Sequence, residues 1–138
     1  MAEPFDIPIE LGKSREFAKA TGSKHPAHYS PGGVTPPTFL MTAILWQGPD
    51  NNAWPKDRDM RRVLHASQEF AFPKGPPRIG MQLTGQQRIE GSHTKEGKRG
   101  GTLTFTTLLT EFRDEKGDLV AEVRNTFVET SKPTGGDH

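Results

Sequence analysis

The sequence predicts an α+β domain in which an antiparallel sheet wraps around one long central helix. The most apolar run of the chain, residues 39–46, comes early and has the length and spacing of a buried helix. Four segments with the composition or alternation of strands follow between residues 63 and 127. A helix that is apolar on all sides and strands that are apolar on one side both bury their surface when the sheet curls around the helix.

Length and composition restrict the class of protein. The 138 residues suffice for one core, and we expect residues 1–130 to form one domain and residues 131–138 to be a flexible tail. The net charge of +1, with acids and bases mixed, gives no electrostatic case for binding nucleic acid. No apolar run approaches the ~20 residues of a membrane span. The absence of cysteine excludes disulfides and thiol chemistry, and it suits a cytoplasmic protein.

The N-terminal third begins with an edge strand and a short helix. Residues 5–10 have an extended pattern, and Pro8 favours a position at the edge of a sheet. Ser14 is the expected N-cap of a helix over residues 15–20, in which Phe17 is the main apolar anchor. Gly22 then ends this helix, because glycine tolerates the left-handed conformation that a helix end often needs.

A polar loop with two histidines, residues 23–38, leads into the central helix. Pro26 prevents a continuous helix, and Pro36 and Pro37 place proline in the first turn of the next one. We expect unpaired N–H groups at that helix start, where a partial positive charge can stabilise a polarised carbonyl or an oxyanion.

The strand candidates are expected over residues 63–72, 81–90, 102–112 and 119–127. Residues sharing a face in each are, in turn, Leu64, Ala66, Phe70 and Phe72; Met81, Leu83, Gly85, Gln87 and Ile89; Leu103, Phe105, Thr107 and Leu109; and Leu119, Ala121, Val123 and Phe127. Residues 114–118 form the last hairpin loop.

Residues 17–29, FAKATGSKHPAHY, resemble the active-site segment of the MaoC-like hot-dog dehydratases and R-specific enoyl thioester hydratases. That segment reads roughly F-A-x-x-[ST]-G-D-x-N-P-[IL]-H. The Asp of this motif falls on Ser23, the Asn falls on His25, and the His falls on His28. Residues 65–70, 95–112 and 122–126 resemble later strands of the same family, in particular its substrate-binding halves.

The resemblance implies a single hot-dog fold and reversible hydration of a 2-enoyl thioester. It implies no cofactor, because coenzyme A or phosphopantetheine carries the substrate as a thioester. His28, with Ser23 at the Asp position, is then the catalytic candidate. Gly33, Pro37, Thr38 and Phe39 are the candidates for substrate binding at the helix start.

Each candidate also has a simpler interpretation. His28 can act as a base near pH 7 or can cap a backbone group. Ser23 cannot replace a carboxylate as a base, and it either binds a water or caps a turn. His25 is interpreted as a loop residue, and no third ligand accompanies His25 and His28 at a metal-binding spacing.

Two other groups of polar residues were considered. Lys98 and Arg99, near Lys95, suit the phosphates of coenzyme A or of a carrier-protein phosphopantetheine, although a solvated hairpin turn is the favoured interpretation. His65 and Glu69 lie four apart on a predicted strand, so we expect them on one face, either as a second acid–base pair or as part of an exposed surface.

Three functions follow from this interpretation. The chain is either a substrate-binding subunit beside a MaoC-like catalytic partner, a self-sufficient homodimeric hydratase that uses His28, or an acyl-thioester-binding domain without turnover. Because a lone hot-dog sheet leaves a strand edge open, we expect a homodimer or a heterodimer.

Overall fold

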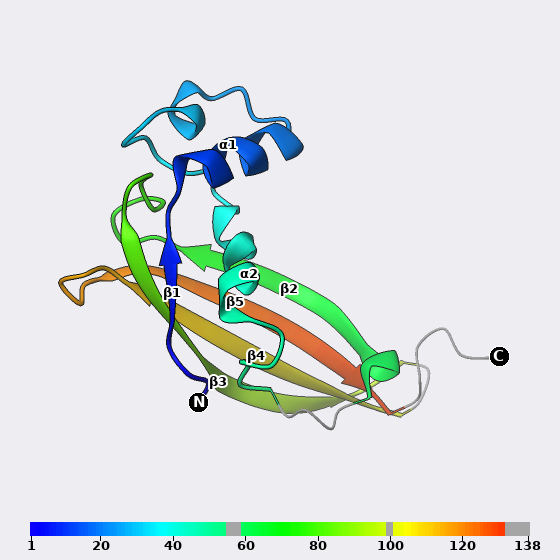
Figure 1. Ribbon diagram of the computed structural model, residues 1–138. Coiled ribbons are helices and arrows are strands. Elements are labelled where there is room, and N and C mark those ends of the chain that lie inside the picture. Colours follow the sequence, from blue (N-terminus) through cyan, green and yellow to red (C-terminus); the bar gives the residue numbers. More distant parts are fainter. Residues whose placement is uncertain (55–58, 99–100, 132–138) are drawn as a thin grey trace.

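The computed structural model describes residues 1–54, 59–98 and 101–131 and confirms the α+β architecture. Its sheet is antiparallel, with the strand order β1-β3-β4-β5-β2 (Figure 1). The strands are β1 (Phe5–Pro8), β2 (Val63–Ala71), β3 (Gln82–Glu96), β4 (Thr102–Arg113) and β5 (Leu119–Thr130). The helices are α1 (Leu11–Ala20), η1 (Pro26–Tyr29), η2 (Phe39–Ala43), α2 (Ile44–Gln47) and η3 (Met60–Arg62). Among these, no helix has the length and hydrophobicity that a membrane crossing requires.

The central helix is shorter and less buried than the sequence predicts. It is a 3₁₀ segment, η2, continued by the single α-helical turn α2, and both lie across one face of the curved sheet (Figure 1). Gly48, with φ of 86°, and Pro49 end the helix after nine residues. Phe39 and Leu40 are buried, but Leu45 is 67% exposed, so the prediction of an apolar helix buried on all sides is wrong at its C-terminal half.

The edge strand β1 is confirmed, and α1 begins earlier than predicted. Phe5 pairs with Gly85 of β3, and its ring meets Phe112 edge-on at 6.1 Å between centroids. Helix α1 starts at Leu11, so Ser14 is not its N-cap. The Ser14 side chain is instead fully buried and serves a contact to the histidine loop that is described below.

The strand faces agree with the sequence pattern in β3 and β5 and depart from it in β2 and β4. Leu83, Gly85 and Gln87 are buried as predicted, and Val123 and Phe127 face the helix. In β4 the residues predicted to share a face, from Leu103 to Leu109, point away from the helix. The residues that point toward the helix are Thr106, Leu108, Thr110 and Phe112. Threonine and leucine occur at both parities of this strand, so alternation alone could not choose the face.

A β-bulge between His65 and Ser67 changes the phase of β2. His65 and Gln68 therefore both face the helix, whereas Glu69 pairs with Arg124 on the far face. The prediction that His65 and Glu69 share a face is wrong for this reason. The extra residue also leaves Leu64 exposed, while Phe70 and Phe72 still pack against the core.

Candidate active site

The histidine loop brings Ser23 and His28 into direct contact. The Ser23 hydroxyl lies 2.5 Å from Nδ1 of His28. Pro26 starts the short helix η1, and His25 caps it, because His25 Nδ1 accepts a hydrogen bond of 3.2 Å from the N–H of Ala27. The His25 ring also stacks on His28 with 5.0 Å between centroids. The interpretation of His25 as an exposed loop residue agrees with this capping role.

The loop is anchored on α1 through its backbone. Ser14 of α1 donates its hydroxyl to the carbonyl oxygen of His28 at 2.7 Å. Tyr29 donates its hydroxyl to the carbonyl oxygen of Ser23 at 2.5 Å, which closes the loop on itself. Gly33 crosses directly over the Ala27 carbonyl, where a Cβ would clash with backbone atoms. These contacts fix the position of the His28 ring relative to Ser23.

The environment of His28 favours the neutral imidazole. The side chain is 8% exposed, and burial together with the charge of nearby His25 lowers the pKa of His28 from its ordinary value of 6.5. A neutral imidazole has one nitrogen free to accept a proton near pH 7. Which nitrogen is free depends on Ser23, because a hydroxyl can either donate to Nδ1 or accept from it.

No carboxylate accompanies this histidine in the loop. The sequence has no Asp or Glu from Thr21 to Pro49, so no acidic side chain of this segment can accept the Nδ1 proton and hold the opposite nitrogen free as a base. Within the described ranges, no three His, Asp or Glu side chains are grouped as a metal site requires. The loop therefore offers one base without its orienting acid.

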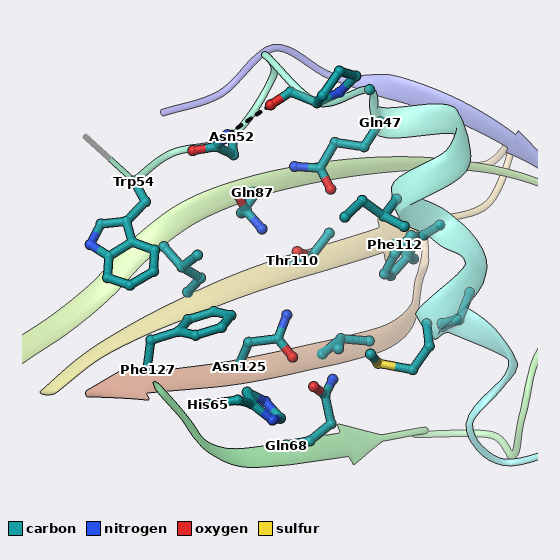
Figure 2. A pocket seen from close by; sticks show the side chains of 18 of the residues that line it. Gln47, Asn52, Trp54, His65, Gln68, Gln87, Thr110, Phe112, Asn125 and Phe127 are labelled. Carbon is teal, nitrogen blue, oxygen red and sulfur yellow. Dashed lines mark hydrogen bonds between the residues drawn. The ribbon is translucent and has the colours of Figure 1, made fainter. Parts of the chain in front are cut away.

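A cavity of about 510 Å³ lies between the helix and the sheet (Figure 2). Its walls are η2 and α2, the loop from Gly48 to Trp54, and strands β2, β3, β4 and β5. The apolar lining includes Leu40, Ile44, Trp54, Leu108, Phe112, Val123 and Phe127. Cavities of roughly 300–1,000 Å³ with mostly apolar walls are typical of small-molecule sites. Because the central helix stops at Gln47, a ligand-sized space remains between the helix, the following loop and the sheet.

Polar side chains also face this cavity, and the sequence reading missed them. Figure 2 shows Gln68, Gln87, Thr110 and Asn125 pointing into it from the sheet. Gln87 Oε1 accepts a hydrogen bond of 2.9 Å from the N–H of Ala53 and so ties the 48–54 loop to the sheet. The sequence did carry a signal for this site, because amides occupy helix-facing positions of strands where apolar residues are usual.

The predicted substrate-binding residues lie around the helix start rather than in the cavity. Phe39 is fully buried and packs edge-on against Phe17 of α1 at 5.8 Å. The N–H of Phe39 donates to the carbonyl of Pro36 at 3.0 Å, and that of Met41 donates to Thr38, so the expectation of free N–H groups is wrong at these two positions. Gly33, Pro37 and Thr38 precede this turn and do not line the cavity.

The two predicted cationic residues are not part of this arrangement. Lys98 is exposed beyond the end of β3, at the opposite end of that strand from β1 and α1 (Figure 1). Arg99 lies outside the described residues. The structure therefore brings together Ser23 and His28 from the predicted set, in a loop that packs against α1 and does not line the cavity.

Comparison with known proteins identifies the family. The family described as "FAS1-like, dehydratase domain region" matches residues 1–123. A UPF0336 protein from Streptomyces coelicolor is 30% identical over 129 residues, which cover 85% of this chain and 82% of the relative.

Solved structures share the fold at low sequence identity. The ChsH1-ChsH2 complex from Mycobacterium tuberculosis gives a TM-score of 0.69 at 17% identity, over 97% of this chain and 85% of the other. The HadBC (3R-hydroxyacyl-ACP dehydratase) complex from the same organism gives 0.62 at 23% identity, over 92% and 95%. A MaoC-like dehydratase from Rhodospirillum rubrum gives 0.63 at 15% identity, over 96% and 94%. The chain has the hot-dog fold of the MaoC-like dehydratases and belongs to the FAS1-like dehydratase domain family.

Proposed function

We propose that this chain is the acyl-binding subunit of an acyl-thioester hydratase/dehydratase and that a MaoC-like partner supplies the complete acid–base pair. The reaction is reversible addition of water to a 2-enoyl thioester. The water oxygen bonds to C3, and C2 takes a proton, giving the 3-hydroxyacyl thioester. The observation that carries the proposal is a loop that keeps His28 but has a hydroxyl, Ser23, at the position of the motif carboxylate, in a chain that also has a ligand-sized cavity.

The cavity suits an acyl chain. Its lining is mainly aliphatic and aromatic, and burying each methylene of a ligand there gains about 0.8 kcal/mol. The carrier is coenzyme A or the phosphopantetheine of a carrier protein, and in either case it remains outside the cavity. Lys98 remains a candidate for its phosphates only if a partner subunit brings the carrier to that end of the sheet, and the proposed role of Arg99 concerns a residue outside the described ranges.

The sheet offers a place for the partner. β1 pairs with β3 only as far as Gly85, and the N–H of Ala2 reaches the carbonyl of Gln87. Of the described strands, none covers the outer edge of β3 from Arg88 to Glu96. An open edge of this length is a liability in a monomer. We propose that a second hot-dog subunit pairs along it, and two of the similar structures are themselves complexes.

A self-sufficient hydratase is the second candidate. It is favoured by the neutral state of His28 and by its direct contact with Ser23, because a hydroxyl that accepts a hydrogen bond from Nδ1 leaves Nε2 free to take a proton from water. In this alternative two copies of the chain form the dimer, and the rate depends on His28. An acyl-thioester-binding domain without turnover is the remaining outcome.

One experiment separates these possibilities. The purified chain is titrated with lauroyl-CoA, and hydration of crotonyl-CoA and of a long-chain 2-enoyl-CoA is followed by loss of enoyl absorbance. Both assays are repeated with a MaoC-like subunit from the same genome that carries the Asp and His. We expect binding by the chain alone and turnover only with the partner. Turnover by the chain alone would support the second candidate, and failure to bind any acyl thioester would overturn the proposal.

A further inference from the structure

The cavity floor carries two polar cross-strand pairs. Gln87 of β3 is directly opposite Thr110 of β4, and Asn125 of β5 is directly opposite Gln68 of β2. All four side chains line the cavity (Figure 2). In the first pair, Gln87 has a hydrogen-bond partner, because its Oε1 accepts from the N–H of Ala53. The second pair is the unusual one.

Gln68 and Asn125 make no hydrogen bond with each other. Both polar atoms of the Gln68 amide, and Oδ1 of Asn125, are inaccessible to solvent and have no hydrogen-bond partner in the described structure. Directly opposite residues have Cβ atoms about 4.5–5.5 Å apart, so an amide–amide bond is within reach and is not formed. From the facing loop, Oδ1 of Asn52 is also without a partner, although its Nδ2 donates to the carbonyl of Pro49 at 3.2 Å.

Such groups are costly unless a bound molecule satisfies them. A buried amide without a partner has lost its hydrogen bonds to water without replacing them, and most native polar groups avoid this. The unsatisfied set consists of three acceptor oxygens and one amide donor. A ketone or ether oxygen could accept a hydrogen bond from the amide donor but could not donate to the three oxygens. A hydroxyl both donates to an oxygen and accepts from the Gln68 amide, so it matches the set in both directions. Because these atoms are covered in the described conformation, the hydroxyl reaches them when the Gln68 and Asn125 side chains turn toward the cavity that they line.

The matching group is neutral. Among the lining residues of the described chain, His65 alone can carry a charge, and it lies on the exposed side of the cavity. A carboxylate would face three acceptor oxygens without a fixed cation. The apolar residues on either side, Val123 and Phe127 along β5, leave room for methylenes next to Asn125.

We propose that Gln68 and Asn125 determine specificity by binding a hydroxyl group on the acyl chain, remote from the thioester. This rests on the proposed function, in which the cavity takes the acyl chain. The hydroxyl is remote because, in the proposed function, the partner's acid–base pair holds the reacting carbons beside the thioester, whereas the cavity of this chain takes the rest of the acyl chain. The substrate class is then hydroxylated acyl thioesters rather than plain saturated chains.

Binding of matched thioesters tests the proposal. The chain contains two tryptophans, so Trp46→Phe leaves Trp54, which stacks on Phe127 at the cavity wall, as a single fluorescent reporter. This protein is titrated with lauroyl-CoA, with analogues hydroxylated at each distal carbon in turn, and with the corresponding methoxy analogues. We expect at least one hydroxylated analogue to bind up to about tenfold more tightly than lauroyl-CoA, as one net hydrogen bond allows. The methoxy analogue at that carbon, which cannot donate, should show no gain.

Leucine variants identify the residues responsible. In Gln68→Leu/Asn125→Leu the dissociation constant for lauroyl-CoA divided by that for the hydroxylated analogue should fall to about one or below. Gln82→Leu, the same exchange at an exposed position of β3 outside the cavity, should keep the wild-type ratio. Circular dichroism checks that each variant is folded, and Gln68→Met replaces a variant that is not.

The outcomes separate the two proposals. If lauroyl-CoA binds but no hydroxylated analogue binds better, the polar floor holds water and the specificity proposal is overturned. The same conclusion follows if the preference survives in the double leucine variant. If no thioester binds at all, the proposed function fails first and the specificity proposal fails with it.

Discussion

The Ser23 hydroxyl contacts Nδ1 of His28 at 2.5 Å, so the side chain at the position of the motif Asp touches the imidazole directly. A carboxylate at residue 23 would accept the Nδ1 proton, raise the pKa of His28 and leave Nε2 as the base. The loop around it is already anchored through Ser14 and Tyr29, so the change is confined to one functional group.

Ser23→Asp should therefore raise enoyl-CoA hydration by the isolated chain. The gain should approach the lower end of the roughly 10²–10⁴-fold that acid–base assistance contributes. Absorbance loss is measured for wild type, Ser23→Asp and Ser23→Asp/His28→Ala, and the last should lose the gain. Strong wild-type turnover that is unaffected by His28→Ala would show that this loop is not the catalytic locus.

Acidification should destabilise the protein through His28. Because its folded pKa lies below the ordinary 6.5, the unfolded chain binds more protons than the folded chain between these two values. The free energy of unfolding should then decrease as the pH falls below about 6.5. Denaturant melts at several pH values in this range measure the free energy of unfolding. Its dependence on pH should be weaker for His28→Gln than for wild type. His93→Gln, on the exposed part of β3, is the control and should keep the wild-type slope.

The two ends of the central helix should respond differently to charge. Leu40 is 3% exposed, so Leu40→Asp places an unpaired charge in the core and should unfold the domain, at a cost of several kcal/mol. Leu45 is largely exposed, so Leu45→Asp should change the free energy of unfolding by about 0.5 kcal/mol or less. Thermal melts of both variants measure this, and a collapse of Leu45→Asp would contradict the exposed position.

Two glycines of β3 form a matched pair for packing. A Cβ on Gly85 would lie 2.6 Å from the Phe5 ring and 2.9 Å from the Phe112 ring, whereas a Cβ on Gly91 meets nothing within 4 Å. Gly85→Ala should therefore destabilise the domain by roughly 1–3 kcal/mol. Gly91→Ala should stay within about 0.5 kcal/mol of wild type in the same urea titration. Equal effects would mean that Phe5 does not pack over this strand.

Association should take place along the open edge of β3. Light scattering at micromolar concentration should show a dimer of the chain, or a heterodimer once the MaoC-like partner is added. Ile89, 42% exposed beside the open edge, should matter to this contact, so Ile89→Asp should weaken it. Leu64→Asp, at a similarly exposed position on the opposite edge strand, should not. A compact monomer under both conditions would contradict the proposed pairing.

The sequence predicted the elements better than their phases. The alternation in β3 placed the strand correctly as far as residue 90, although it continues to Glu96, and the hairpin loop over residues 114–118 was placed correctly. The bulge after His65 has no such signature, because it depends on the register with β5. The exposure of Leu45 depends on how far the sheet curls, which is a tertiary property.

The candidate site was predictable where a motif specified it and not where packing created it. Ser23 and His28 were singled out by the resemblance of residues 17–29 to a family motif, and the structure places the two side chains in contact. Gln68 and Asn125 are 57 residues apart by their numbers and become neighbours only through strand pairing. Each carries a local signal, an amide on an otherwise apolar strand face, but that signal does not show that the two residues meet at a cavity.

The strand order has a consequence for how the cavity comes into existence. β3, β4 and β5 are neighbours both in the chain and in the sheet, whereas each edge strand pairs with a partner far along the chain, as Phe5 does with Gly85 and Val63 with Glu129. Long-range pairings must meet the entropy of closing a large loop before their contacts form, which slows folding. The cavity is therefore complete only after β2 has joined the sheet and residues 39–54 have closed over it. A thioester that binds this closed state and not the unfolded chain shifts the folding equilibrium toward it by mass action.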